Sequence, residues 1–344
     1  MEGELKMLET EYQTKMDAAR REMKTLPCLN NADDSTKFYK GVEGIEVELI
    51  QVPTNPYKVL FELAVATWGD ERFETQWPRT SPENRFRVVK AVLSGQALPT
   101  ILESINFQFI VRNVSRAAFD QHARQRFSAF FSIGTRDNSR LGHGVRIPTT
   151  FYHEGASPEQ ARLLEDVKAH HLNGKALYKR ILEAGMSFED ARVVVPEATT
   201  HHYKFASNYS ALKMFLGQRL QACEMADVVA TAILVLESVN GLFPLLASHL
   251  TPGCDKAKKC TYRGQLTSEA PTSTDMFSAL FSGCERWPDR IPYATFHTPC
   301  SSYEKINAEL GTDFRGPKDW VHYKTFDALD HKDMTLMCEE WVPE

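Results

Sequence analysis

Hydrophobicity alternates with a period of two along residues 104–111, and this alternation constrains the fold more than any other feature of the chain. Ile105, Phe107, Phe109 and Val111 are apolar, and the residues between them are mostly polar. Because side chains two apart on a strand lie on the same face, the segment is predicted to be a strand with one face buried in a core.

A second alternating segment lies earlier in the chain, at residues 45–49, and helix signals follow it. Asn55-Pro56 provides an N-cap and a first-turn proline for a helix over residues 57–68. Ser81-Pro82 begins another helix, which ends at Gly95. Strands separated by helices are typical of an α/β or α+β domain, and we expect that class.

The later part of the chain is predicted to be mainly helical. Residues 113–128 have helical character, and the residues after Phe130 lose periodicity as far as Pro148, which predicts a long functional loop. The capping box Ser157-Pro-Glu-Gln160 begins a long helix that runs toward Gly185, and Ser187-Phe-Glu-Asp190 caps a short one before Pro196. One long amphipathic helix is expected from about Asn208 to Val239. Its apolar face would carry Leu212, Phe215, Leu216, Cys223, Ala226 and Ala230.

Composition limits the classes of partner. The net charge of -5 argues against a nucleic-acid or membrane-surface binder, so any anion site must be built from local arginines. No segment is long and apolar enough to span a membrane, and the charged N-terminus lacks the apolar core of a signal peptide, which predicts a cytoplasmic protein. We expect an N-terminal helical extension over residues 1–44, the main domain over 45–260 and a C-terminal extension over 261–344.

Cysteine and histidine usage does not favour a metal site. The seven scattered cysteines indicate reduced thiols, and the spacing of Cys254 and Cys260 matches no common zinc motif. His201 and His202 would point to opposite faces of a strand, so a shared metal site is disfavoured. Cys223 lies on the predicted apolar face, where a packing role is more common than a nucleophilic one.

Arginines gather in the stretch QHARQRFSAFFSIGTRDNSR at residues 121–140. Asp120 is spaced by four from both Arg116 and Arg124, so it can bridge the two along one helix face. That pairing leaves three guanidiniums past the helix end, where planar bidentate donors suit a phosphate. They belong to Arg126, Arg136 and Arg140.

Arg219 falls on the apolar face of the predicted long helix. A guanidinium is costly to bury unless an anion or a hydrogen-bond acceptor meets it. The alternatives are a pairing with Glu224 or Asp227, or a side chain that reaches the surface. Periodicity alone does not decide between a ligand contact and these structural roles.

These residues resemble the signature of the flavin-dependent thymidylate synthases. Arg124-Gln125-Arg126 is followed by seven residues and then by Gly134, Thr135 and Arg136, in the frame of the family's Arg-His-Arg motif. Upstream, Pro99, Glu103 and the strand Ile105–Phe109 resemble a second family pattern. Downstream, Ala191-Arg192-Val-Val-Val-Pro196 and the run from Asn208 through Leu212 and Phe215-Leu216 to Arg219 resemble a third, without gaps from Arg192 to Arg219.

The resemblance covers about residues 45–260 and implies a fold, a reaction and site residues. It implies an α/β (α+β) domain with a mixed sheet and long helices, assembled as a homotetramer with active sites between subunits. A methylene group would pass from methylenetetrahydrofolate to C5 of a pyrimidine nucleotide through FAD, with NADPH as reductant and Arg219 as catalytic residue. FAD would be held by Glu103, Arg124, Gln125, Arg126 and Asn208. The nucleotide would be bound by Gln121, Ser132, Gly134, Thr135, Arg136, Arg192 and Arg219.

Departures from the family pattern concentrate where the substrate is handled. Gly134 replaces the signature Ser, Ser132 an acidic residue, Gln125 the central His and Asp120 an Arg, with further changes at Gln96 and Ser210. Because a changed hydrogen-bond complement alters substrate selection, three functions stay open. They are conversion of dUMP to dTMP, methylation or hydroxymethylation of another pyrimidine nucleotide such as dCMP, and a non-catalytic flavin- or nucleotide-binding role.

Overall fold

The computed structural model describes residues 36–53, 55–69, 72–132, 143–148, 151, 158–220 and 224–250. Strands occupy β1 (Phe38–Lys40), β2 (Glu46–Gln51), β3 (Asn106–Ser115), β4 (Ser128–Ser132), β5 (Val145–Ile147) and β6 (Thr200–Asn208). The α-helices are α3 (Pro56–Trp68), α4 (Gln76–Arg79), α5 (Pro82–Leu93), α6 (Arg116–His122), α7 (Pro158–Glu183), α8 (Phe188–Ala191), α9 (Tyr209–Arg219), α10 (Ala226–Leu242) and α11 (Pro244–Ala247). Short 3-10 helices are η1 (Phe73–Thr75), η2 (Pro99–Ser104) and η4 (Arg192–Val194).

A four-stranded antiparallel sheet in the order β2-β3-β6-β4 forms the centre of the fold. Its register places Phe109 opposite Phe205, which in turn lies opposite Phe130 on β4. A separate parallel pair joins β1 to β5. The described part of the chain is thus a mixed α/β arrangement, and the expected fold class is confirmed.

The hydrophobic core lies between one face of this sheet and helices α6, α9 and α10. Phe109 and Phe205 are both buried and stack with ring centroids 4.8 Å apart. Phe215 of α9 packs against Phe205, and Phe119 of α6 packs against Tyr203. The helices therefore cover the face that carries the alternating aromatic residues, as the period of two predicts.

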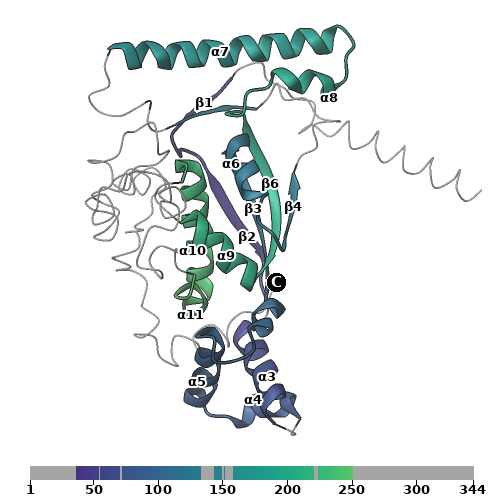
Figure 1. Cartoon of the computed structure of the whole chain (residues 1–344), viewed down its shortest axis with the longest axis vertical. Coiled ribbons are helices and arrows are strands. Elements are labelled where there is room, and N and C mark those ends of the chain that lie inside the picture. The colour runs from purple at the N-terminus through teal and green to yellow at the C-terminus, as the bar shows by residue number, and fades with distance from the viewer. Residues whose placement is uncertain are drawn as a thin grey trace, which may run out of the picture.

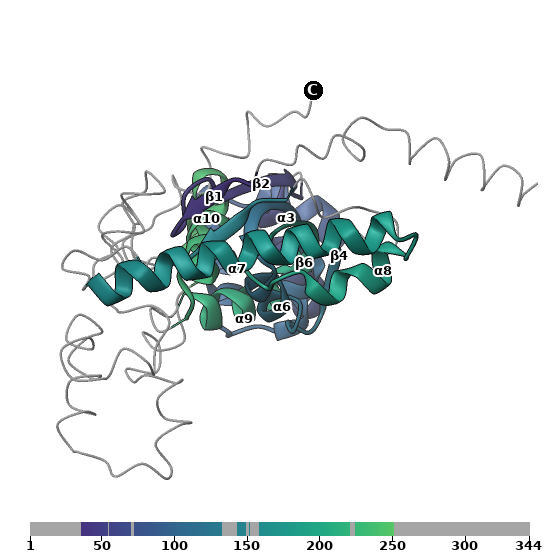
Figure 2. The same ribbon diagram turned by 90° about the horizontal axis from the view of Figure 1, so that it is seen from above.

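Helices also enclose the two ends of the sheet (Figure 1). Helices α3 to α5 lie at one end, where Asn55 and Ser81 accept the predicted capping hydrogen bonds from Lys58 and Asn84. The long helix α7 lies across the other end, next to α8 (Figure 2). Within the described residues, no helix combines the length and the apolar character that a membrane span requires.

Two predicted helices have the wrong bounds. The helix expected over residues 113–128 is only α6, because β3 continues to Ser115 and β4 begins at Ser128. The helix expected from Asn208 to Val239 is divided into α9 and α10, and Asn208 itself ends β6. The extension expected over 1–44 contains β1, which pairs with β5; the domain boundaries stay predictions.

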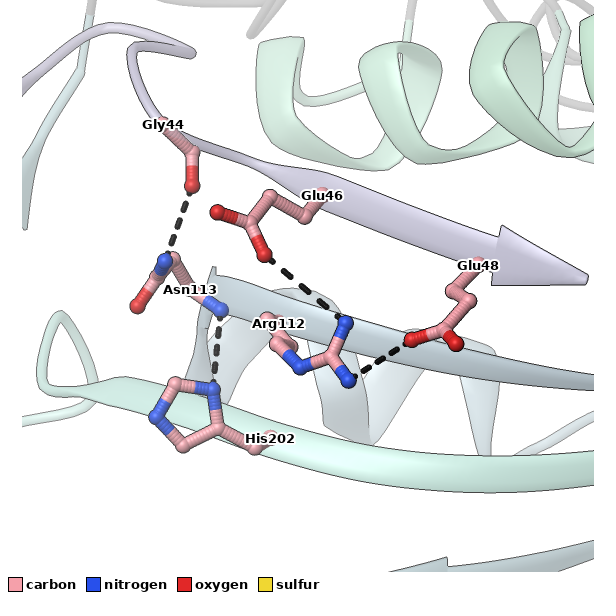
Figure 3. A network of polar contacts seen from close by, with 6 residues as sticks. All are labelled: Gly44, Glu46, Glu48, Arg112, Asn113 and His202. Atoms are coloured by element: carbon pink, nitrogen blue, oxygen red, sulfur yellow. Dashed lines mark hydrogen bonds and ion pairs between the residues drawn. The ribbon is translucent and has the colours of Figure 1, made fainter.

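An irregularity in β3 is held by a polar network (Figure 3). The pairing with β6 shifts between Val111 and Val114, and Asn113 has a positive φ of 62°. The Asn113 backbone N–H donates to His202 Nδ1 at 3.1 Å, and its side-chain amide donates to the carbonyl of Gly44 at 2.9 Å (Figure 3). These bonds compensate for the backbone strain of a left-handed Asn.

A buried arginine anchors the same irregularity. Arg146 is 3% exposed, and its guanidinium donates to the backbone carbonyls of Gly41 at 2.6 Å, Glu43 at 3.0 Å and Asn113 at 2.9 Å. Its charge is therefore solvated by peptide carbonyls that come from two separate segments, the turn before β2 and the bulge of β3. This arrangement fixes β5 against the turn before β2 and against the bulge of β3.

Candidate functional site

The first cluster of site residues forms where α6 and α9 end. Arg219, the last residue of α9, donates from Nη2 to the backbone carbonyl of Gln121 at 2.8 Å and from Nη1 to Glu224 at 3.0 Å. The side chains of Arg219 and Glu224 are only 13% and 16% exposed. The predicted alternative of a pairing with Glu224 is thus confirmed, and the structure also brings Arg219 to Gln121.

Three polar atoms in this cluster are buried without a hydrogen bond from any other described residue. They are Arg219 Nε, a donor, Gln121 Oε1, an acceptor, and Nε2 of His122. The side-chain amide nitrogen of Gln121 donates to Met225 Sδ at 3.1 Å, so the side-chain oxygen is the atom that can still accept a hydrogen bond. A buried unpaired polar atom costs about 1–3 kcal/mol, so this donor and acceptor favour a polar ligand.

The base of the cluster is a neutral buried histidine. His122 is fully buried, and its Nδ1 lies 2.6 Å from the hydroxyl of Tyr203 on β6. Burial, reinforced by the nearby Arg219 charge, lowers the pKa of His122 to about 3, against a smaller opposing effect from the Val228 backbone. Burial also raises the pKa of Tyr203. Both groups are therefore uncharged near pH 7, so neither places a charge next to Arg219.

The residues expected to hold the flavin gather around the turn between α6 and β4 and the start of α9. Gln125 is buried, and its Nε2 donates to the carbonyls of Arg126 at 3.3 Å and Ala211 at 3.5 Å. Asn208 caps α9 by accepting from the N–H of Ala211 at 2.8 Å. These two residues are therefore fixed on either side of Ala211, with their side-chain hydrogen bonds used locally.

The exposed part of this turn offers cations and an aromatic ring. Arg124 and Arg126 are exposed and make no ion pair with another described residue, so the predicted bridge from Asp120 to Arg124 is wrong because α6 ends at His122. Phe127 is 78% exposed and has a positive φ of 63°, which is strained for a bulky residue. Two guanidiniums and an exposed aromatic ring fit an anionic aromatic cofactor such as FAD. Glu103 is exposed on η2, which contacts α9.

A second group of site residues lines a cleft of about 450 Å³ between α6 and the segment that leads into β6. Arg116 and Arg192 both line it, together with Glu197, Thr199 and other residues of the segment 193–201. Backbone bonds join the two walls, from the N–H of Arg116 to Thr199 at 3.0 Å and from that of Ala117 to Glu197 at 3.1 Å. The cleft is therefore a fixed part of the fold.

Close contact with α7 positions Arg192. Gly174 lies in the middle of α7, and a Cβ there would come within 3.0 Å of the Val194 carbonyl and 3.6 Å of Pro196. Helix α7 can therefore lie directly against η4, which begins with Arg192. The guanidinium of Arg192 is half exposed and lies 3.6 Å from Glu189.

Some predicted residues are not brought into either cluster. Ser132 is exposed at the end of β4. Gly134, Thr135, Arg136 and Arg140 lie outside the described residues, as do Ser157, Cys223, Cys254 and Cys260. His201 is buried beside Phe119, while His202 binds the Asn113 N–H, so the two imidazoles occupy opposite faces of β6 as expected.

Sequence reasoning missed residues of the cleft. Arg116 was expected only to pair with Asp120, and this bond exists at 3.0 Å, but the residue also lines the cleft. Thr199 and Thr200 carry no motif that marks them as site residues. Their closeness in sequence to Arg192, a predicted site residue seven positions before Thr199, is the signal that could have identified them.

Comparison with known proteins identifies the family of the chain. The family model of the thymidylate synthase complementing protein matches residues 48–245, which hold every described element from β3 to α10. The chain is 26% identical over 223 residues to a flavin-dependent thymidylate synthase of Nitratidesulfovibrio vulgaris, covering 62% of this chain and 90% of that protein. A flavin-dependent thymidylate synthase of Thermococcus kodakarensis is 27% identical over 225 residues, covering 63% and 89%.

A solved structure also resembles the fold. The crystal structure of a UMP/dUMP methylase, PolB from Streptomyces cacaoi, bound with 5-Br dUMP, superposes with a TM-score of 0.52 at 17% identity. The match covers 61% of this chain and 96% of that one. The chain therefore belongs to the thymidylate synthase complementing protein family and is a flavin-dependent thymidylate synthase-like enzyme, as its sequence indicated.

Proposed function

We propose that the protein transfers a one-carbon unit from methylenetetrahydrofolate to C5 of a pyrimidine deoxynucleotide, with dUMP converted to dTMP as the main reaction. The observation that carries the proposal is the buried donor and acceptor on Arg219 and Gln121, two residues that contact each other. A pyrimidine presents both donors and acceptors on its ring edge, so such a pair is complementary to it. The structurally similar PolB is a UMP/dUMP methylase, which supports a uracil nucleotide as substrate.

Arg219 is proposed to polarise the pyrimidine ring. Its guanidinium is mostly buried, where a fixed charge acts more strongly on a reacting group than it would in water. Glu224 and the Gln121 carbonyl hold two of its nitrogens, so the third is aimed without freedom to rotate away. Neutral His122 behind it adds no competing cation.

The turn between α6 and β4 is proposed to hold FAD. Bound reduced flavin would supply the electron-rich carrier that the one-carbon transfer requires. Arg124 and Arg126 would bind its anionic groups and Phe127 would pack against a ring, while Gln125 and Asn208 hold the backbone of this region in place. NADPH as reductant, the homotetramer with shared sites and the cytoplasmic location are parts of the same proposal.

The second candidate is methylation or hydroxymethylation of another pyrimidine nucleotide, such as dCMP. It is favoured by Ser132, which stands where the family pattern has an acidic residue and is exposed at the end of β4. Loss of a carboxylate beside the base would change which ring substituents are accepted.

The product assay decides between these functions. Purified protein is titrated with FAD, and the flavin absorbance that stays with the protein is measured. The loaded protein is then incubated with methylenetetrahydrofolate, NADPH and either dUMP or dCMP, and the product mass is determined. Mass gain on dUMP supports the main proposal, gain on dCMP alone refutes it in favour of the second, and failure to retain flavin contradicts both.

A further inference from the structure

The cleft between α6 and the segment 192–200 contains an arginine that neither the family signature nor the Arg219 cluster includes. Arg116 is the first residue of α6, and its backbone N–H is bonded to the Thr199 carbonyl at 3.0 Å. Arg192 lines the same cleft from η4, in which Val195 closes a turn onto the Arg192 carbonyl at 3.0 Å. Two arginines from different elements therefore line one cavity whose backbone is held by hydrogen bonds.

The orientation of Arg116 is set by its neighbours on α6. Its Nε donates to Asp120 Oδ1 at 3.0 Å, and its guanidinium carbon lies 5.4 Å from the centre of the Phe119 ring. The two terminal nitrogens make no hydrogen bond to another described residue. Because Arg116 pairs with Asp120 through Nε, its two terminal nitrogens, Nη1 and Nη2, are available to donate to a second anion.

Other lining groups favour an oxyanion. Thr199 and Thr200 are 7% and 2% exposed, line the cleft, and their hydroxyls are not bonded to other described side chains. Hydroxyl donors next to guanidiniums suit the multiple oxygens of a phosphate. Glu197 also lines the cleft, so its charged lining residues are two arginines and one exposed carboxylate.

We propose that Arg116, held by Asp120, is a binding residue for the 5′-phosphate of the nucleotide and acts with Arg192 across the cleft. The proposal deepens the proposed function, on which it rests for the identity of the ligand. Asp120 is a positioning residue, because it acts through Arg116. A volume of about 450 Å³ gives the phosphate and its sugar room in the cleft.

The test compares the affinities for dUMP and for 2′-deoxyuridine, which lacks the phosphate, measured by isothermal titration calorimetry on the full chain. We expect Arg116→Ala to weaken dUMP binding by about tenfold or more and to leave deoxyuridine binding unchanged. Arg116→Lys keeps the positive charge but lacks the two parallel N–H donors of a guanidinium, so it should recover only part of the dUMP affinity that Arg116→Ala loses. Asp120→Ala should weaken dUMP binding less than Arg116→Ala, and Asp120→Asn should restore it because the amide oxygen still accepts from Nε.

Arg112→Ala is the matched control. Arg112 is 37% exposed against 38% for Arg116 and makes an ion pair at 2.8 Å with Glu48, but it lies on β3 next to β2 (Figure 3). Both variants remove one positive charge, so a general electrostatic effect would appear in both. Thermal unfolding of each variant checks that it is folded before titration.

Three outcomes overturn the inference. It is wrong if Arg116→Ala keeps the preference for dUMP over deoxyuridine, or if wild-type protein has no such preference. It is also wrong if Arg116→Ala weakens methylenetetrahydrofolate binding and spares dUMP, because the anion would then be a folate carboxylate. Flavin retention and product mass are measured on the same preparations, so failure of the proposed function is recognised separately.

Discussion

Arg219 donates a hydrogen bond to the backbone carbonyl of Gln121 at 2.8 Å, although the two residues are 98 positions apart in the sequence. The bond ties the end of α9 to the end of α6 and leaves Arg219 Nε as a buried donor. Arg219→Ala should abolish turnover, with a fall in kcat of at least about a hundredfold, because the charge aimed at the pyrimidine is lost. Steady-state kinetics with dUMP measures the effect, and near-normal activity would reject the catalytic role.

Glu224→Gln is the control for that substitution. It removes the negative partner at 3.0 Å but keeps the guanidinium and its bond to Gln121. We expect it to retain far more activity than Arg219→Ala. Equal losses in the two variants would mean that loss of the ion pair, and not loss of the guanidinium charge, causes the fall in activity.

His122 should make the protein less stable as the pH falls. Its folded pKa of about 3 lies below the ordinary value of 6.5, so between these values the unfolded chain binds a proton that the folded chain excludes. Stability is therefore fully present above pH 6.5 and declines toward pH 3, with a slope of about 1.4 kcal/mol per pH unit for one proton. His122→Phe should flatten this dependence in urea unfolding measured from pH 7 to pH 4. An unchanged slope would show that other groups cause it.

Gly174 and Gly241 form a matched pair for testing the contact of α7 with η4. Both are helical, but an added Cβ at Gly241 meets nothing within 4 Å, whereas one at Gly174 meets the Val194 carbonyl at 3.0 Å. Gly241→Ala should stabilise the protein by about 0.5–1 kcal/mol through helix propensity. Gly174→Ala should lose that gain and weaken dUMP binding by shifting Arg192. Equal stabilisation by both substitutions, from chemical denaturation, would contradict the close packing.

Arg146→Met should destabilise the fold strongly. The substitution leaves the carbonyls of Gly41, Glu43 and Asn113 without their shared donor, and unpaired buried acceptors cost about 1–3 kcal/mol each. We expect a loss of at least about 2 kcal/mol in urea unfolding. Arg112→Met, which breaks an exposed ion pair, should cost less than about 1 kcal/mol. Similar losses would mean that the carbonyl network contributes little.

The sequence predicted the elements whose signals are local. The alternation at 104–111 and the caps at Asn55, Ser81 and Ser187 all correspond to observed elements. The extent of β6 was not predicted beyond the strand assumed at His201 and His202, because its buried face carries His201 and Ser207 as well as Tyr203 and Phe205, which weakens the alternation. The break between α9 and α10 has no Gly or Pro, and α10 begins without a side-chain cap at Met225. Its first turn is tied instead by tertiary bonds from Ser115 to Asp227.

The site residues that belong to the family's sequence pattern could be predicted. The residues that reach the site only through long-range contacts of the fold could not. The bond between Gln121 and Arg219 joins residues that the resemblance assigned to the same substrate, and the structure brings them together. Arg116 reaches the cleft only because α6 is bonded to the backbone at Glu197 and Thr199. A long-range backbone contact of this kind has no local sequence pattern.

Helix α6 has Arg116 at its first residue and Gln121 one residue before its end. Five residues of helix rise about 7.5 Å, and this rigid interval separates the two clusters. If the proposals made above hold, Arg116 at one end of α6 binds the phosphate and Gln121 near the other end binds the base. Both residues can bind at once only when phosphate and base belong to one molecule of matching length. A free base or inorganic phosphate would satisfy one end alone, so the length of this single helix would itself select for mononucleotides.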